Sequence, residues 1–135
     1  PPYPTKPIPI IVGGHSDLAL ERAARIGDGW AVVTGPGQGA GLDAIGARID
    51  VLRGFLAKAG REGAPFELLC QNMLGFTSSP NPKAPFVGPP AAIAENLRAL
   101  AARGVTMVDL TVFGPPELVI ETATRFAEEV RPLLG

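Results

Sequence analysis

Short apolar blocks alternate along this chain with longer stretches in which apolar residues recur at helical spacing. The blocks at residues 8–12, 30–33, 66–74 and 105–113 predict four strands. The first block contains three isoleucines and a valine, as a strand covered on both faces should. A stretch with helical spacing follows each strand, within residues 18–27, 42–60, 88–104 and 114–133.

Each predicted helix carries an apolar stripe that is suited to packing on a sheet. The stripes consist of Leu20, Ala23, Ala24 and Gly27 in the first helix; Leu42, Ile45, Ile49, Leu52 and Leu56 in the second; Ile93, Leu97, Leu100 and Ala101 in the third; and Val119, Ala123, Phe126, Val130 and Leu133 in the last.

Regular alternation of strands and helices predicts an α/β fold with a parallel sheet and right-handed crossovers. The longest irregular segments, residues 35–41 and 77–90, both follow predicted strands. The second of them has five prolines and is expected to be a loop without a buried strand. In such folds the strand carboxyl ends form the functional face, so we expect a site there.

Composition narrows the class of protein. The chain has 135 residues, enough for one compact domain, whereas a complete (β/α)₈ barrel usually needs about 200 or more. Its net charge of −1 comes without a basic stripe, which argues against nucleic acid as a partner. The single cysteine, Cys70, excludes an internal disulfide. No apolar run is long enough for a membrane span, so we expect a cytoplasmic protein.

The turn after the first strand is the strongest candidate for a binding site. Gly13 and Gly14 let backbone approach a ligand, and Ser16 is a plausible N-cap of the helix that follows. Helix N-termini bind anions because their free N–H groups and the dipole point at the ligand. Thr34 and Gly35 end the neighbouring strand and are expected at the same place. On residues alone, an ordinary tight turn explains the glycines equally well.

This turn and the segments after it resemble a known family. The run from Pro7 to Ser16, followed by 19–30, resembles the luciferase-like monooxygenase superfamily of flavin- and deazaflavin-dependent oxidoreductases. Weaker similarities continue in order at 59–61, 88–95 and 104–105. The resemblance therefore covers nearly the whole chain, but only the C-terminal half of the family's barrel.

Several expectations follow from the resemblance. It implies a (βα)₄ half of a TIM-type (β/α)₈ barrel with residues 1–7 as an extended lead-in, and either FMN or coenzyme F-420 as cofactor. It assigns the cofactor phosphate to one set of positions: Gly13, Gly14, His15, Ser16, Thr34 and Gly35. His15 departs from the small residue that many members have there. The resemblance also implies that the cofactor ring lies mostly against the missing half.

Other polar residues have less specific interpretations. Asp28 lies between two glycines and is expected to brace the turn on the face opposite the ligand. Glu67, Gln71 and Asn72 interrupt an apolar strand and lie either near a ligand or at the rim. Cys70 is expected to be a small buried hydrophobe. The sequence has no Ser/His/Asp set, metal-ligand cluster or P-loop, and it identifies no catalytic residue.

Three functions remain open at this point. The first is the C-terminal portion of a luciferase-like monooxygenase or reductase that acts on a small organic substrate, with the isolated chain inactive. The second is a stand-alone half-barrel that binds a phosphorylated ligand without catalysis, and the third is a structural or assembly fragment. The start at Pro1 without an initiator Met suggests a fragment, a cleaved product or a partly observed protein. Unpaired edges at 8–12 and 105–113 predict a homo-oligomer joined through its sheet.

Overall fold

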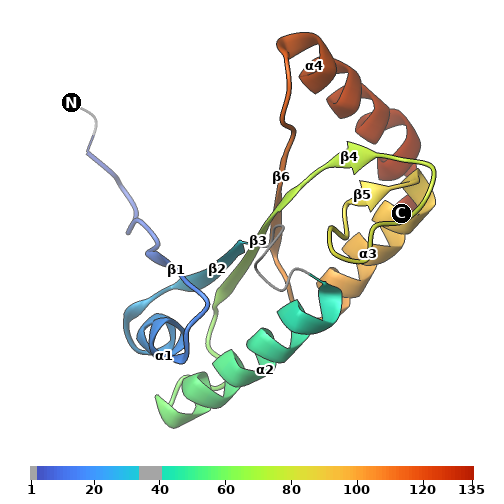
Figure 1. Ribbon diagram of the computed structural model, residues 1–135. Helices are drawn as coiled ribbons and strands as arrows, with labels where there is room; N and C mark the ends of the chain where they lie inside the picture. The colour runs from blue at the N-terminus through green and yellow to red at the C-terminus, as the bar shows by residue number, and fades with distance from the viewer. Residues whose placement is uncertain (1–2, 34–40) are drawn as a thin grey trace.

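The computed structural model describes residues 3–33 and 41–135, and its strands and helices alternate as the sequence predicts (Figure 1). In chain order the elements are β1 (Ile11–Gly13), α1 (Asp17–Ile26), β2 (Gly29–Val33), α2 (Leu42–Lys58), β3 (Glu67–Met73), β4 (Gly75–Phe76), β5 (Val87–Gly88), α3 (Pro90–Ala102), β6 (Met107–Thr111) and α4 (Pro116–Arg125), followed by a π-helical turn (Phe126–Val130) and a 3₁₀ turn (Arg131–Leu133).

The main sheet has four parallel strands in the order β1-β2-β3-β6. Val12 lies beside Trp30, Val32 beside Cys70, and Cys70 beside Val108. The predicted parallel α/β arrangement is therefore confirmed, and β1 and β6 are the two edges of this sheet, as the sequence analysis expects.

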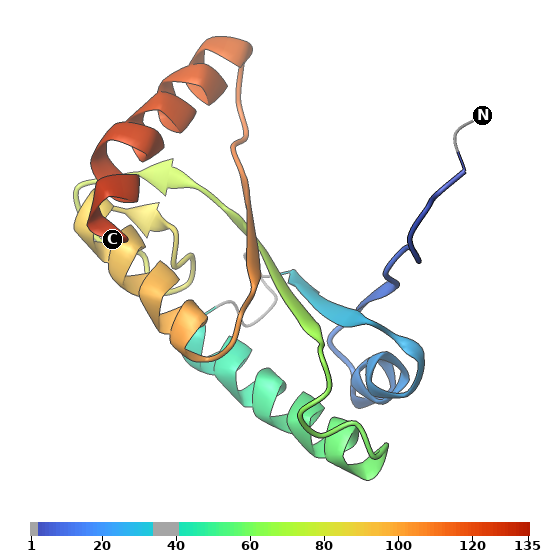
Figure 2. The ribbon, with the colours of Figure 1, turned by 180° about the vertical axis from the view of Figure 1, so that it is seen from behind.

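One face of the sheet is covered by α1, α2 and α3, which follow its curvature on one side (Figure 2). The side chains of Trp30 and Cys70 on this face have no solvent-exposed surface, and Val32 retains 3%. Against them pack the predicted helix stripes, of which Leu20, Ile49, Leu52, Ile93 and Leu100 are at most 1% exposed. Cys70 is thus a buried residue, as expected.

The opposite face of the sheet is open. Successive residues of a strand point to opposite faces, so Val33 and Met107 lie on the side away from the helices. Val33 is 45% exposed and Met107 56% exposed. The same four strands therefore have one buried and one exposed face.

The expectation for the first strand is wrong in two respects. Pairing begins only at Ile11, and Ile8, Ile10 and Ile11 are 70%, 58% and 38% exposed instead of buried on both faces. The physical reason is that β1 is an edge strand covered on one side only. Val12 alone of its three residues faces the helices.

The long loop at 77–90 is also more structured than predicted. β4, directly before the loop, pairs in parallel with β5 near the end of the loop, with Gly75 beside Val87. Phe86 has no exposed surface, and Ala84 retains 4%. The prolines stiffen the loop without preventing it from inserting an aromatic ring into the core.

The final predicted stripe is largely exposed. Val119 is 37% and Leu133 44% exposed, Ala123 is exposed as well, and Val130 is fully buried. The helical spacing changes at the π-helical turn, which rotates later residues relative to those of α4. In both views α4 lies beyond α3, at the end of the row of helices farthest from α1 (Figures 1 and 2). Similarly, Ala101 in α3 is exposed rather than part of the inner stripe.

Candidate functional site

The turn between β1 and α1 has a backbone that requires glycine. Gly14 adopts φ +125°, a conformation that side-chain-bearing residues rarely adopt. A Cβ at Gly14 would lie 2.7 Å from the Ala19 Cβ, so a side chain there would also clash with the helix. A Cβ at Gly13 would meet nothing within 4 Å. The space beside Gly13 is thus open for a ligand to approach.

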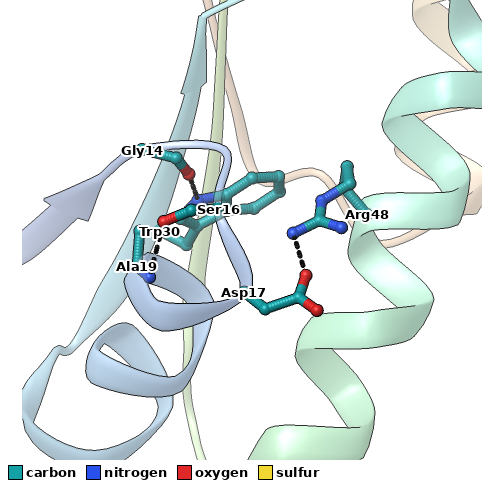
Figure 3. Close-up of polar contacts among 6 residues, drawn as sticks. All are labelled: Gly14, Ser16, Asp17, Ala19, Trp30 and Arg48. Carbon is teal, nitrogen blue, oxygen red and sulfur yellow. Dashed lines mark hydrogen bonds and ion pairs between the residues drawn. The ribbon is translucent and has the colours of Figure 1, made fainter.

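A buried tryptophan holds this turn in place. The Trp30 Nε1–H donates a hydrogen bond of 2.8 Å to the Gly14 carbonyl oxygen (Figure 3). Because Trp30 is completely buried in the core, its indole fixes the turn relative to the sheet. The sequence pattern places Trp30 only in a strand, because a side-chain bond to a backbone carbonyl 16 residues away has no sequence signature.

The start of α1 is capped as predicted. The Ser16 Oγ accepts a hydrogen bond of 3.2 Å from the Ala19 N–H, and the Ser16 carbonyl accepts bonds from the Ala19 and Leu20 N–H groups. The first N–H groups of a helix have no partner within the helix itself. Figure 3 shows the serine and glycine of this turn on the same side of the helix end.

An arginine from α2 reaches the same helix end. The Arg48 Nη2 lies 2.8 Å from the Asp17 Oδ1, and the Arg48 side chain is 28% exposed (Figure 3). Its Nε is buried and has no hydrogen-bond partner within residues 3–33 and 41–135. The pair places a guanidinium beside the turn, with Asp17 as its partner. Arg48 was missed because its contact crosses 31 residues of sequence.

The structure brings four of the six predicted phosphate-site residues together at the carboxyl end of β1. Gly13 is the last residue of β1, Gly14 and His15 form the turn, and Ser16 caps α1. The other two, Thr34 and Gly35, lie outside the described residues. Their convergence with Ser16 therefore stays a prediction.

Asp28 performs the structural role that the sequence predicts. Its Oδ2 accepts a hydrogen bond of 2.8 Å from the Ile10 N–H, and its own N–H donates to the Ile10 carbonyl at 2.8 Å. Its carbonyl accepts a further bond from the Glu67 N–H. These contacts connect β1, β2 and β3 where the strands begin, at the end opposite the Gly14 turn.

The polar residues Gln71 and Asn72 of β3 lie on opposite faces of the sheet. Asn72 is 4% exposed and lies on the helix-covered face, whereas Gln71 lies on the open face. The Gln71 Nε2 donates a hydrogen bond of 3.0 Å to the Asp109 Oδ2 on β6. Asp109 was not a sequence candidate, although it interrupts the apolar run 105–113 and could have been found from strand alternation.

Neither a metal-ligand cluster nor a membrane-spanning helix is found in the part of the chain that the structure describes. Within 3–33 and 41–135, no group of three or more His, Cys, Asp and Glu side chains could hold a metal ion. In the same part of the chain, every helix is too short or too polar to cross a bilayer.

Known proteins resemble this chain in sequence and in fold. The sequence profile of the luciferase-like monooxygenase family matches residues 1–80. The chain belongs to this family. An uncharacterised protein of Mycobacterium tuberculosis is 49% identical over 76 residues, which are 56% of this chain and 24% of that protein. An uncharacterised protein of Mycobacterium bovis matches with the same values.

Solved structures share the fold at low sequence identity. A coenzyme F-420-dependent tetrahydromethanopterin reductase of Methanopyrus kandleri has a TM-score of 0.69 and 13% identity, over 95% of this chain and 51% of that one. An F-420-dependent secondary alcohol dehydrogenase has a TM-score of 0.71 and 12% identity, over 98% and 50%. A monooxygenase from Streptomyces bottropensis has a TM-score of 0.63 and 15% identity, over 94% and 48%.

The chain thus spans about half the length of these solved proteins and a quarter of its curated relatives. The predicted fold class, the (βα)₄ half of a luciferase-like (β/α)₈ barrel, is confirmed. The family assignment made from the runs at 7–16 and 19–30 is confirmed as well.

Proposed function

We propose that this chain is the C-terminal portion of a luciferase-like flavin- or deazaflavin-dependent oxidoreductase and supplies the loops that bind the cofactor phosphate. The observation that carries the proposal is the fixed turn at Gly14, which presents the N-terminus of α1 next to the Arg48 guanidinium. Family membership supports the class of reaction. Solved structures of similar fold support the class of cofactor: two are F-420-dependent enzymes, and a third is a riboflavin lyase with modified FMN.

The residues at the turn fit a phosphate. First-turn N–H groups and the helix dipole attract an anion, and the Ser16 hydroxyl can donate while its oxygen caps the helix. Arg48 contributes a cation, and its ion pair with Asp17 offsets the negative charge that Asp17 places in the first turn. Gly13, Gly14 and His15 would line this phosphate-binding site, here called the phosphate cradle. Thr34 and Gly35, which follow β2, would complete it.

The bound cofactor would supply the redox chemistry, with a small organic substrate, while residues of this chain bind and orient it. Four further strands, supplied by the remainder of a longer polypeptide, would cover the open face and close the barrel. A second copy of this chain is the other source of four strands, which gives a homo-oligomer joined through β1 and β6. Without either, half of the site is missing, and the isolated chain is expected to have no turnover.

The phosphate cradle is tested by substitution in the full-length protein. Arg48→Gln removes the guanidinium charge, and a charge-assisted hydrogen bond corresponds to about a tenfold to hundredfold change in affinity. We expect this loss for FMN and F-420 but not for riboflavin, which has the same ring system as FMN and no phosphate. Fluorescence titration measures the dissociation constants.

Gly13→Asp is the second variant, because a Cβ at Gly13 meets nothing within 4 Å and the carboxylate would enter the space in which we propose that the phosphate binds. Gly54→Asp on α2 is the matched control, because a Cβ at Gly54 also meets nothing within 4 Å. Unchanged FMN and F-420 affinity in folded Arg48→Gln and Gly13→Asp proteins would refute the phosphate cradle. Binding of inorganic phosphate without any flavin or deazaflavin would instead favour the non-catalytic half-barrel.

A further inference from the structure

An aspartate and a glutamine lie side by side on the open face of the sheet. Gln71 on β3 is in register with Asp109 on β6, and the Gln71 Nε2 donates to the Asp109 Oδ2 at 3.0 Å. One pairing position earlier on the same face lie Leu69 and Met107, which are apolar. A polar pair, of which Asp109 is the ionisable member, thus follows an apolar row towards the carboxyl ends of the strands.

The pair lies at the same edge of the sheet as the Gly14 turn. Gln71 is in register with Val33, the last residue of β2. Gly13, the last residue of β1, pairs with Ala31, two residues before Val33. Neighbouring strands are about 4.8 Å apart, so β3 is roughly 10 Å and β6 roughly 14 Å from β1 across the sheet. A ligand with its phosphate at the turn would extend along this edge towards the pair.

The charge of Asp109 needs a second partner once the face is covered. A carboxylate that leaves water must accept hydrogen bonds, because an unsatisfied buried charge is costly. Gln71 satisfies Oδ2, and its bond fixes the carboxylate on the open side of β6. Oδ1 is the other acceptor of this carboxylate, and once the face is covered it requires an N–H or O–H donor.

We propose that Asp109, held by Gln71, accepts a hydrogen bond from the pyrimidinedione N–H of a bound flavin-type ring. This inference rests on the proposed function. Flavins and 5-deazaflavins share that ring edge, an N–H between two carbonyl groups, so the contact is the same for FMN and F-420. The phosphate at α1 and the ring N–H at Asp109 would fix the two ends of one cofactor across the sheet.

The phosphate contact and the ring contact can be tested separately. The full-length protein is titrated with FMN, riboflavin and N3-methylriboflavin. Asp109→Ala should weaken FMN and riboflavin alike, by about tenfold to hundredfold, as loss of a hydrogen bond to a charged group does. The N3-methyl compound lacks the N–H, so its affinity should be the same for wild type and variant. If the protein binds F-420, the phosphate-free deazaflavin replaces riboflavin.

Glu67→Ala is the matched control, because Glu67 is an acidic residue on the same face of β3 but at the end where the strand begins. Asp109→Asn keeps the shape of the side chain and should give a smaller loss in the same direction. This inference alone would be overturned if Asp109→Ala left riboflavin affinity unchanged while Arg48→Gln still weakened FMN binding and not riboflavin binding. Absence of any flavin or deazaflavin binding by wild type would overturn both proposals.

Discussion

The two faces of the main sheet consist of alternate residues of the same four strands, yet their environments are opposite. On the covered face Trp30 and Cys70 have no exposed surface. On the open face Met107 is 56% exposed, and Gln71 and Asp109 form a polar pair. Both faces of a parallel sheet are normally buried, so the open face is the incomplete one.

The difference between the two faces assigns stability to the covered face and binding to the open face of the same sheet. The covered face packs against helices of this chain. At Trp30, for example, the ring is fully buried and its N–H donates to the Gly14 carbonyl oxygen, so its contacts are made within the described residues. The open face has the apolar surface and the polar pair that a bound ring and further strands would use. Substitutions on the covered face should therefore act on folding, and those on the open face on binding and closure.

The largest effect is expected at Trp30. Trp30→Ala removes a fully buried ring and should lower the free energy of unfolding by about 3–5 kcal/mol, from lost burial and the cavity left behind. Urea denaturation of the 135-residue chain, followed by circular dichroism, measures this loss. Leu118→Ala on the largely exposed α4, where Leu118 is 41% exposed, is the control and should change stability far less. Similar losses in the two variants would contradict the division between covered and open regions.

Most of the fold around the buried Trp30 is predictable from the sequence. The strand positions, the parallel sheet and the helix stripes around Leu20 and Ile49 follow from the apolar pattern and the alternation of elements, because these elements pack within the chain. Periodicity fails where the packing partner is absent or irregular. The exposure of Ile10 and Val119 depends on what lies beside β1 and α4, and the burial of Phe86 depends on the path of a proline-rich loop.

The site was predictable in its backbone and not in its supporting side chains. Gly14 and Ser16 have local signatures, a positive-φ turn and an N-cap, which the sequence contains within a few residues. Trp30, Arg48 and Asp109 act across strands or helices, so their roles depend on register and packing that one sequence does not specify.

An intermediate effect is expected when only the indole N–H is removed. Trp30→Phe keeps an aromatic ring in the core but leaves the Gly14 carbonyl oxygen without its donor. An unsatisfied polar group costs about 1–3 kcal/mol, so the variant should be less destabilised than Trp30→Ala. Hydrogen exchange should also be faster at the Ala19 and Leu20 amides, because the turn is held less firmly. Unchanged exchange there would show that the indole does not fix the turn.

The smallest effect in the 135-residue chain is expected on the open face. Met107 is 56% exposed, so Met107→Ala should change the free energy of unfolding by no more than about 0.5 kcal/mol when the chain is a monomer. In the full-length protein, where we propose that further strands cover this face, the same substitution should cost about 2–5 kcal/mol, as truncation of a buried methionine does. Urea denaturation of both proteins gives the two values, and sedimentation of the 135-residue chain reports its oligomeric state. A large loss in a dimeric 135-residue chain would indicate that a second copy covers the face, whereas small losses in both proteins would refute closure of the sheet over Met107.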